Sequence, residues 1–156
     1  MAQEIERKFL PKNDAWRGLA VGTFYRQGYL STTKERTVRI RTIKDQGYLT
    51  VKGAAKGAVR AEYEYEIPIK DANEMLDRLC ERPIIEKERY EIDHKGLIWV
   101  VDEFHGENKG LILAEVELSH EDQEIDMPHW VGKEVTGEPK YFNANLTVSP
   151  FAGWSV

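Results

Sequence analysis

Alternation between charged and apolar residues is the strongest constraint on what this chain can fold into. In the first such segment, Ala2–Leu10, Glu4, Glu6 and Lys8 fall on one side, and the residues between them fall on the other. A period of two residues is typical of a β-strand whose two faces meet different surroundings. Seven further segments are predicted as strands by alternation or by β-favouring composition: Thr23–Leu30, Thr37–Ile43, Tyr48–Lys52, Val59–Ile69, Ile84–Ile92, Leu97–Phe104 and Leu111–Leu118.

Helical segments are fewer. Asp71–Cys80 has Glu74 three residues after Asp71, a spacing that resembles a capping box and predicts a helix. Shorter helical segments are predicted over Asp14–Leu19, at Ser119–Asp122 and over Tyr141–Val148.

The 156 residues contain no internal repeat and no linker-like change in composition, so one domain covering residues 1–156 is expected. The predicted class is α+β, with mostly antiparallel strands and peripheral helices. Eight strands are compatible with a closed barrel and with a stacked sandwich, and the pattern alone leaves both open.

Composition excludes several classes of function. The formal net charge of −5 argues against a general nucleic-acid binder, which would carry a basic excess. The single cysteine, Cys80, allows no internal disulfide, so a reducing, cytoplasmic compartment is expected. No stretch approaches the ~20 apolar residues of a membrane span, so no membrane association is expected. The chain is expected to act as a monomer or a homodimer.

Like charges repeatedly occupy positions i and i+2 of the predicted strands, where side chains share a face ~6.6 Å apart. One such pair is ordinary for a solvated face. Adjacent like charges repel, however, so the repetition of separate acidic and basic pairs indicates two counter-charged surfaces. The acidic pairs are Glu4/Glu6, Glu62/Glu64 (extended by Glu66) and Glu115/Glu117, and the basic pairs are Arg39/Arg41 and Lys87/Arg89.

These residue types favour one kind of ligand. Carboxylate pairs suit a hard divalent cation such as Mg²⁺ or Mn²⁺, and Arg and Lys suit phosphate oxygens. Lys8, Lys52 and Arg60 continue charged strand faces, and Asp102 interrupts an apolar strand. The pattern therefore indicates a site for a metal–polyphosphate complex.

At these residues the sequence resembles the CYTH superfamily, the triphosphate tunnel metalloenzymes. The family's motif E-x-E-x-K is matched by Glu4-Ile5-Glu6-Arg7-Lys8. Further segments match in order along almost the whole chain: Gln27-Gly28-Tyr29-Leu30, Val38-Arg39-Ile40-Arg41, Leu49-Thr50-Val51-Lys52-Gly53, Arg60 with Glu62 and Glu64, Lys87-Glu88-Arg89-Tyr90, Asp102, Ala114-Glu115-Val116-Glu117-Leu118, Glu134-Val135-Thr136 and Lys140-Tyr141-Phe142-Asn143.

The resemblance implies an eight-stranded antiparallel barrel whose polar faces line a tunnel. It also implies roles for the charged residues. Lys8 and Lys87 are the candidates for a catalytic lysine that transfers a proton. The implied phosphate-binding residues are Lys8, Arg39, Arg41, Lys52, Arg60, Lys87, Arg89 and Lys140, and the implied metal ligands are Glu4, Glu6, Glu62, Glu64, Asp102, Glu115 and Glu117.

The function implied is metal-dependent hydrolysis of a triphosphate or polyphosphate, with inorganic tripolyphosphate as the expected substrate and Mg²⁺ or Mn²⁺ as cofactor. The same tunnel would serve thiamine or nucleoside triphosphates. Cyclisation of ATP to cyclic AMP, as in class IV adenylyl cyclases, is the alternative reaction. A non-catalytic polyphosphate binder is the third reading, and the acid pairs argue against it because binding alone needs mainly cations.

Overall fold

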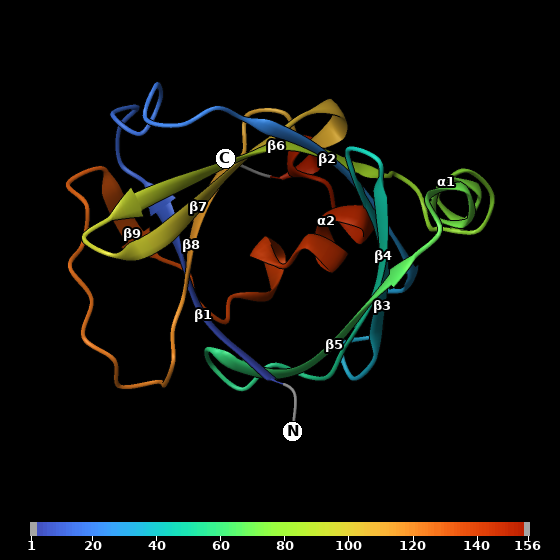
Figure 1. Ribbon diagram of the computed structural model, residues 1–156, viewed down its shortest axis with the longest axis horizontal. Helices are drawn as coiled ribbons and strands as arrows, with labels where there is room; N and C mark the ends of the chain where they lie inside the picture. The colour runs from blue at the N-terminus through green and yellow to red at the C-terminus, as the bar shows by residue number, and fades with distance from the viewer. Residues whose placement is uncertain (1–2, 155–156) are drawn as a thin grey trace.

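A closed barrel of eight antiparallel strands organises the computed structural model, which describes residues 3–154 (Figure 1). β1 pairs with β8 on one side and with β5 on the other, and this second pairing closes the sheet. The predicted barrel is therefore confirmed and the sandwich is excluded. The strands are β1 (Gln3–Pro11), β2 (Thr23–Ser31), β3 (Thr37–Ile43), β4 (Gln46–Lys52), β5 (Val59–Ile67), β6 (Ile85–His94), β7 (Leu97–Phe104) and β8 (Ile112–Glu117), in the order β5-β4-β3-β2-β6-β7-β8-β1.

A ninth strand, β9 (Val131–Glu134), was not predicted and pairs with the end of β1. The helices are α1 (Ile69–Arg78) and α2 (Asn143–Val148), with 3-10 turns η1 (Gly106–Asn108), η2 (Pro139–Tyr141) and η3 (Phe151–Gly153). Ala2, with which the first predicted strand begins, lies outside the described residues.

Two of the predicted helices are wrong. Residues 14–19 and 119–122 form turns and bends instead. In the first segment, Trp16 is 1% exposed and its ring meets Tyr90 edge-on at 5.3 Å. Burial of this large ring against the barrel fixes the local path of the chain, which overrides a weak helical pattern.

The main hydrophobic core lies outside the barrel wall. Phe9, Trp99 and Val116 point outward from β1, β7 and β8, and they pack with Trp16 and Trp130 from the segments that wrap the barrel. Since successive strand residues face opposite sides, this leaves the charged positions of the same strands facing inward. The apolar residues of these alternating strands therefore lie on the outside of the barrel, and the charged residues lie on the inside.

α1 covers the outer face of β3 and β4. Ala72 and Leu76 are fully buried there against Ile40, together with Cys80 just beyond the helix. The helix begins two residues earlier than predicted, after Pro68, without a side-chain cap, so the capping box at Asp71 is wrong. Proline at the residue before the helix supplies a φ already suited to it.

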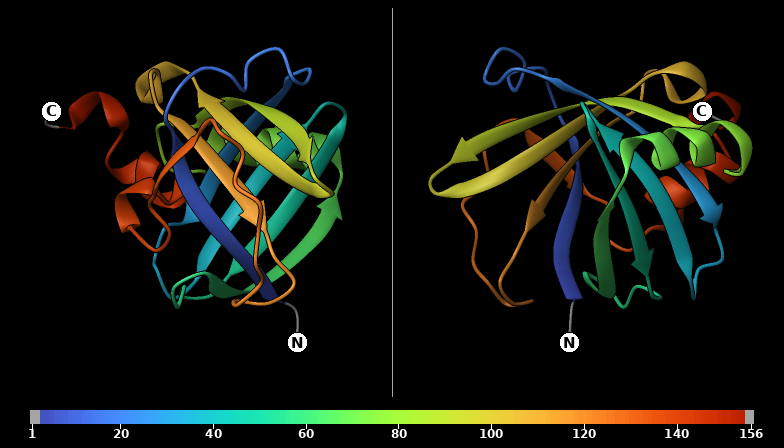
Figure 2. Two further views of the ribbon diagram at one scale, coloured as in Figure 1. Left: turned by 90° about the vertical axis from the view of Figure 1, so that its left-hand side faces the viewer. Right: turned by 45° about the vertical axis from the view of Figure 1, so that its right-hand side comes forward.

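α2 covers one open end of the barrel, as the two side views show (Figure 2). Ala144 and Leu146 of α2 pack in an apolar cluster with Ile85, Phe104 and Leu113. This cluster fixes α2 across the barrel end. Among the helices of residues 3–154, none has the length and apolarity needed to cross a membrane.

Candidate functional site

A cavity of about 970 Å³ fills the barrel interior, and the inward-facing charged residues of the strands line much of it. All the site residues predicted from the sequence line it except Asp102 and Lys140. Those that line it are Glu4, Glu6, Lys8, Arg39, Arg41, Lys52, Arg60, Glu62, Glu64, Lys87, Arg89, Glu115 and Glu117.

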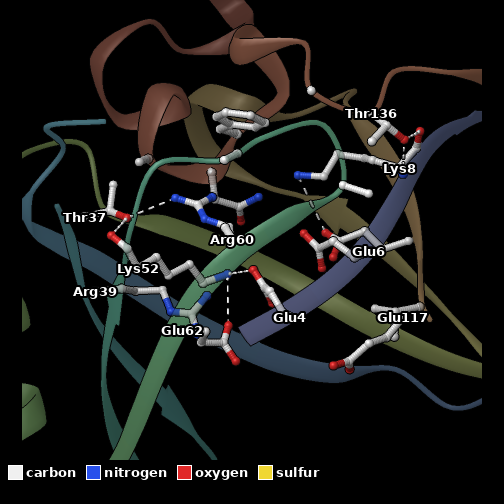
Figure 3. Close-up of a pocket in the computed structure, with 18 of the residues that line it drawn as sticks. Glu4, Glu6, Lys8, Thr37, Arg39, Lys52, Arg60, Glu62, Glu117 and Thr136 are labelled. Atoms are coloured by element: carbon white, nitrogen blue, oxygen red, sulfur yellow. Dashed lines mark hydrogen bonds and ion pairs between the residues drawn. The ribbon is translucent and has the colours of Figure 1, made fainter. Parts of the chain in front are cut away.

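Lys52 holds two carboxylates together on one part of the wall (Figure 3). Its Nζ lies 2.8 Å from Glu4 and 3.2 Å from Glu62. Burial raises the pKa of Glu4. At Glu62 burial is outweighed by a hydrogen bond with Glu4 and by the charge of Lys52, so the pKa of Glu62 is lowered. The two acids therefore share one cation and have opposite tendencies to hold a proton.

A second acidic group forms where β1 meets β8. Glu6 is paired across the strands with Glu117, and Lys8 with Glu115. Burial, and then the negative charges of Glu115 and Glu4, raise the pKa of Glu6 to about 8. Among the ion pairs of residues 3–154 none includes Glu6, so this partly buried carboxyl group lies among acids without a direct ion pair.

Asp102 shares the inward face of β7 with Ile98 and Val100, but Lys87 and Arg89 cover it, so it does not line the cavity itself. Its carboxylate, 1% exposed, accepts two hydrogen bonds from Arg89 at 2.8 Å and lies 2.8 Å from Lys87 Nζ. Burial opposes its ionisation, but the charges of Arg89 and Lys87 hold the pKa of Asp102 well below its usual range. Both oxygens are thus engaged by cations that do line the cavity, and Asp102 orients these cations.

Lys87 is buried to the same degree as Asp102. Burial, reinforced by the charges of Arg89 and Arg41 and opposed by Asp102, holds the pKa of Lys87 well below its usual value. The surroundings of Lys87 therefore favour giving up a proton.

Arg39 and Arg60 complete the basic wall. Arg39 donates to Thr50 at 3.1 Å and to Glu64 at 3.3 Å, and its buried Nε has no hydrogen-bond partner within residues 3–154. Arg60 donates to the carbonyl of Gly53 and to Thr37. An unpaired N–H on a buried guanidinium is a donor that an anionic ligand would satisfy.

Phe142 lines the cavity directly before α2. The centre of its ring lies 5.5 Å from Lys8 Nζ and 5.7 Å from the Arg60 guanidinium carbon. In Figure 3, Lys8 and Arg60 lie on the side of the cavity nearer the carboxy-terminal segment, and Glu4 and Glu62 lie farther from it.

The structure does not bring Lys140 into the cavity. Its Nζ lies over the rings of Tyr141 and Trp154, at 5.2 and 4.7 Å, on the exposed side of η2. On β5, Glu62 and Glu64 line the cavity whereas Glu66 is exposed and does not.

Uncharged polar residues at the site had no role assigned from the sequence. Gln27 and Thr50 are fully buried, and Asn143 lines the cavity. Gln27 shares the inward face of β2 with Tyr25 and Tyr29, so alternation along this strand could have predicted that Gln27 faces the barrel interior. Asn143 belongs to the segment Lys140-Tyr141-Phe142-Asn143 that resembles the family, but no role was predicted for it.

The donor set fits a divalent cation. Within residues 3–154 no three acidic, His or Cys side chains converge as a preformed metal group, because Glu4 and Glu62 turn toward Lys52. Glu6, Glu115 and Glu117 nevertheless supply carboxylate oxygens, the ligands that Mg²⁺ and Mn²⁺ prefer. A cation beside Glu6 would also offset the burial and the neighbouring negative charges that raise the pKa of Glu6.

A closed barrel with a charged cavity of this kind defines a polyanion-binding tunnel protein. The model of the CYTH domain family matches residues 2–147, and the chain belongs to this family. It is 52% identical over 151 residues to an inorganic triphosphatase of Acetivibrio thermocellus, with 97% of each chain covered.

An inorganic triphosphatase of Nitrosomonas europaea is 36% identical, with 94% of this chain and 97% of that one covered. A crystal structure of an inorganic triphosphatase aligns with a TM-score of 0.67 at 34% identity, covering 93% of this chain and 97% of the other.

Proposed function

We propose that this protein is a metal-dependent inorganic triphosphatase that hydrolyses tripolyphosphate inside the barrel. The observation that carries the proposal is one cavity lined by both cations and carboxylates. The cations match the charge of a triphosphate, and the carboxylates match the metal ion that accompanies it. The names of the two curated relatives support the choice of an inorganic substrate.

The basic residues bind the phosphate oxygens. Arg39, Arg41 and Arg89 present guanidinium groups to the cavity, and Lys8, Lys52, Arg60 and Lys87 add further positive charge. Held in a buried site, these charges need no rearrangement as negative charge moves from the bridging bond to the leaving group.

Glu4, Glu6, Glu115 and Glu117 would hold the cation, and Glu62 and Glu64, which line the same cavity, are candidates as further ligands. Mg²⁺ or Mn²⁺ bound there would neutralise phosphate charge and lower the pKa of a bound water. In the reaction, a water oxygen bonds to the terminal phosphorus and the bond from that phosphorus to the bridging oxygen breaks. One proton of the water stays on the new orthophosphate and the other passes to the solvent. The products are orthophosphate and pyrophosphate.

Lys87 is the candidate for the proton transfer that accompanies this step. Its ammonium faces the cavity beside Arg41 and Arg89, and its lowered pKa favours donation of a proton to the departing pyrophosphate oxygen. Asp102 keeps the lysine in place.

One assay tests the proposal. The protein is incubated with tripolyphosphate or with ATP, under Mg²⁺ and under Mn²⁺, and orthophosphate, pyrophosphate and cyclic AMP are measured. Metal-dependent release of orthophosphate from tripolyphosphate is expected. Cyclic AMP and pyrophosphate from ATP would identify a cyclase, and tight binding without products would identify a binding protein.

A further inference from the structure

Asn143 occupies an unusual position at the start of α2. An Asn at this point commonly bonds to nearby backbone groups, but α2 has no side-chain cap. The side chain instead reaches into the barrel, where Oδ1 accepts hydrogen bonds from Lys87 Nζ and from Gln27 Nε2, each at 2.8 Å. The ammonium of Lys87 can only donate, so the amide must turn its oxygen toward it.

These two bonds connect Asn143 to three cations of the cavity wall. Gln27, which is fully buried, uses its own oxygen to accept from Arg41 Nε at 3.1 Å. Lys87 is held on its other side by Asp102, which also binds Arg89. One hydrogen-bonded network thus runs from the helix at the barrel end to Lys87, Arg41 and Arg89.

The chemistry of the amide suits this place. Lys87 already faces one carboxylate, Asp102, at 2.8 Å. A second carboxylate would neutralise the lysine and repel a phosphate, whereas an amide oxygen orients the ammonium and leaves its charge available.

The contact is not needed to fix α2 in place. Ala144 and Leu146 anchor the helix in the apolar cluster, and Asn145 donates to the carbonyl of Pro139 at 2.7 Å. Since α2 has these anchors of its own, its position is set independently and can impose a position on Lys87.

We propose that Asn143 is a positioning residue that holds Lys87, and through Gln27 also Arg41, in the geometry that receives the triphosphate. This role deepens the proposed function and rests on it. The segment around η2 and α2 therefore contributes to the site through Asn143, and Lys140 points away.

The test compares Asn143→Ala and Asn143→Asp with wild type and with Asn73→Ala. Asn73 is a matched control because its amide oxygen also accepts from a cation, Arg26, but on the outer face of the barrel. Binding of tripolyphosphate without metal is measured by calorimetry, hydrolysis by orthophosphate release, and folding by the midpoint of thermal unfolding.

Asn143→Ala is expected to weaken binding and to lower kcat/KM by about tenfold, because a hydrogen bond to a charged group is lost. Asn143→Asp keeps the acceptor and the shape but adds charge. It is expected to unfold no earlier than wild type and yet to bind tripolyphosphate at least as weakly as Asn143→Ala. Asn73→Ala is expected to bind and turn over as wild type does.

If Asn143 only anchored α2, the order of affinities would be reversed. Asn143→Asp would then bind tripolyphosphate as wild type does, and the weaker binding of Asn143→Ala would accompany a lower midpoint of thermal unfolding. Either that order or wild-type affinity in Asn143→Ala overturns the inference. Because affinity is measured without turnover, a wild type that binds tripolyphosphate and fails to hydrolyse it would count against the proposed function and still test Asn143.

Discussion

Glu6 of β1 lies directly across from Glu117 of β8, so two like charges face each other inside the barrel. Like charges directly opposite on antiparallel strands are destabilising. The pKa of Glu6 is raised as well, first by burial and then by the negative charges of Glu115 and Glu4. The arrangement costs stability in the metal-free protein and provides oxygen ligands for a cation.

The first prediction concerns the pH dependence of stability. The pKa of Glu6 rises from 4.5 to about 8 on folding, so between these values the folded protein keeps a proton that the unfolded chain has lost. Stability of the metal-free protein should therefore fall as pH rises through this window. Thermal unfolding in EDTA at several pH values measures it. In Glu6→Gln the fall should be smaller, and at pH 8 its midpoint should lie at least about 4 °C above wild type. Equal midpoints for the two proteins at pH 8 would contradict this account of Glu6.

A second prediction separates an orienting role for Asp102 from the role of a metal ligand. Asp102→Asn leaves Lys87 and Arg89 buried without their shared counter-charge. Loss of one partner from a buried ion pair costs about 3–5 kcal/mol. Urea unfolding in EDTA should show a decrease of this size. Glu117→Gln, which removes a carboxylate that faces the cavity, should show none. If Asp102→Asn were as stable as wild type and simply lost metal affinity, Asp102 would be a ligand after all.

The third prediction compares Lys8, which lines the cavity, with Lys140, which does not. Lys140→Ala should keep KM for tripolyphosphate within about twofold of wild type, because Lys140 lies over Trp154 outside the cavity. Lys8→Ala should raise KM about ten- to a hundredfold, in line with the loss of a charge-assisted hydrogen bond to phosphate. Steady-state kinetics at saturating Mg²⁺ measures both. A large effect of Lys140→Ala would place that lysine back among the phosphate-binding residues.

The fourth prediction concerns the thiol of Cys80. Burial raises its pKa to about 11, and the side chain packs under α1. Because the thiolate is the reactive form, modification of native protein by a thiol reagent at pH 8 should be much slower than modification of protein unfolded in urea. Equal rates in the two states would show that α1 does not cover Cys80.

The positions of most strands could be predicted from the sequence, because alternation depends only on residues close together in the chain. Thr37–Ile43 and Leu97–Phe104 begin and end where predicted. β9 was missed because Val131–Glu134 is short and contains a glycine, so its pairing with β1 depends on the closed barrel and not on its own pattern. Closure itself came from the family resemblance, since alternation fits a barrel and a sandwich equally.

The site was predictable to the extent that strand residues two apart share a face. Alternation of this kind put Glu4, Glu6 and Lys8 on the cavity wall. Alternation could not show that Lys87 and Arg89 cover Asp102. Which side chains contact a carboxylate depends on the register between neighbouring strands, and β6 places Arg89 opposite Asp102. Lys140 and Asn143 belong to short helical turns, where side-chain direction depends on how the segment packs on the barrel end.

The central claim is that the acids of the first strand serve metal-dependent hydrolysis. Its most direct test is orthophosphate release from tripolyphosphate under Mg²⁺ by wild type and by Glu4→Gln/Glu6→Gln, with thermal unfolding confirming that both are folded. We expect turnover by wild type, abolished by EDTA, and none above background by the double variant. Hydrolysis by the double variant at the wild-type rate would contradict it.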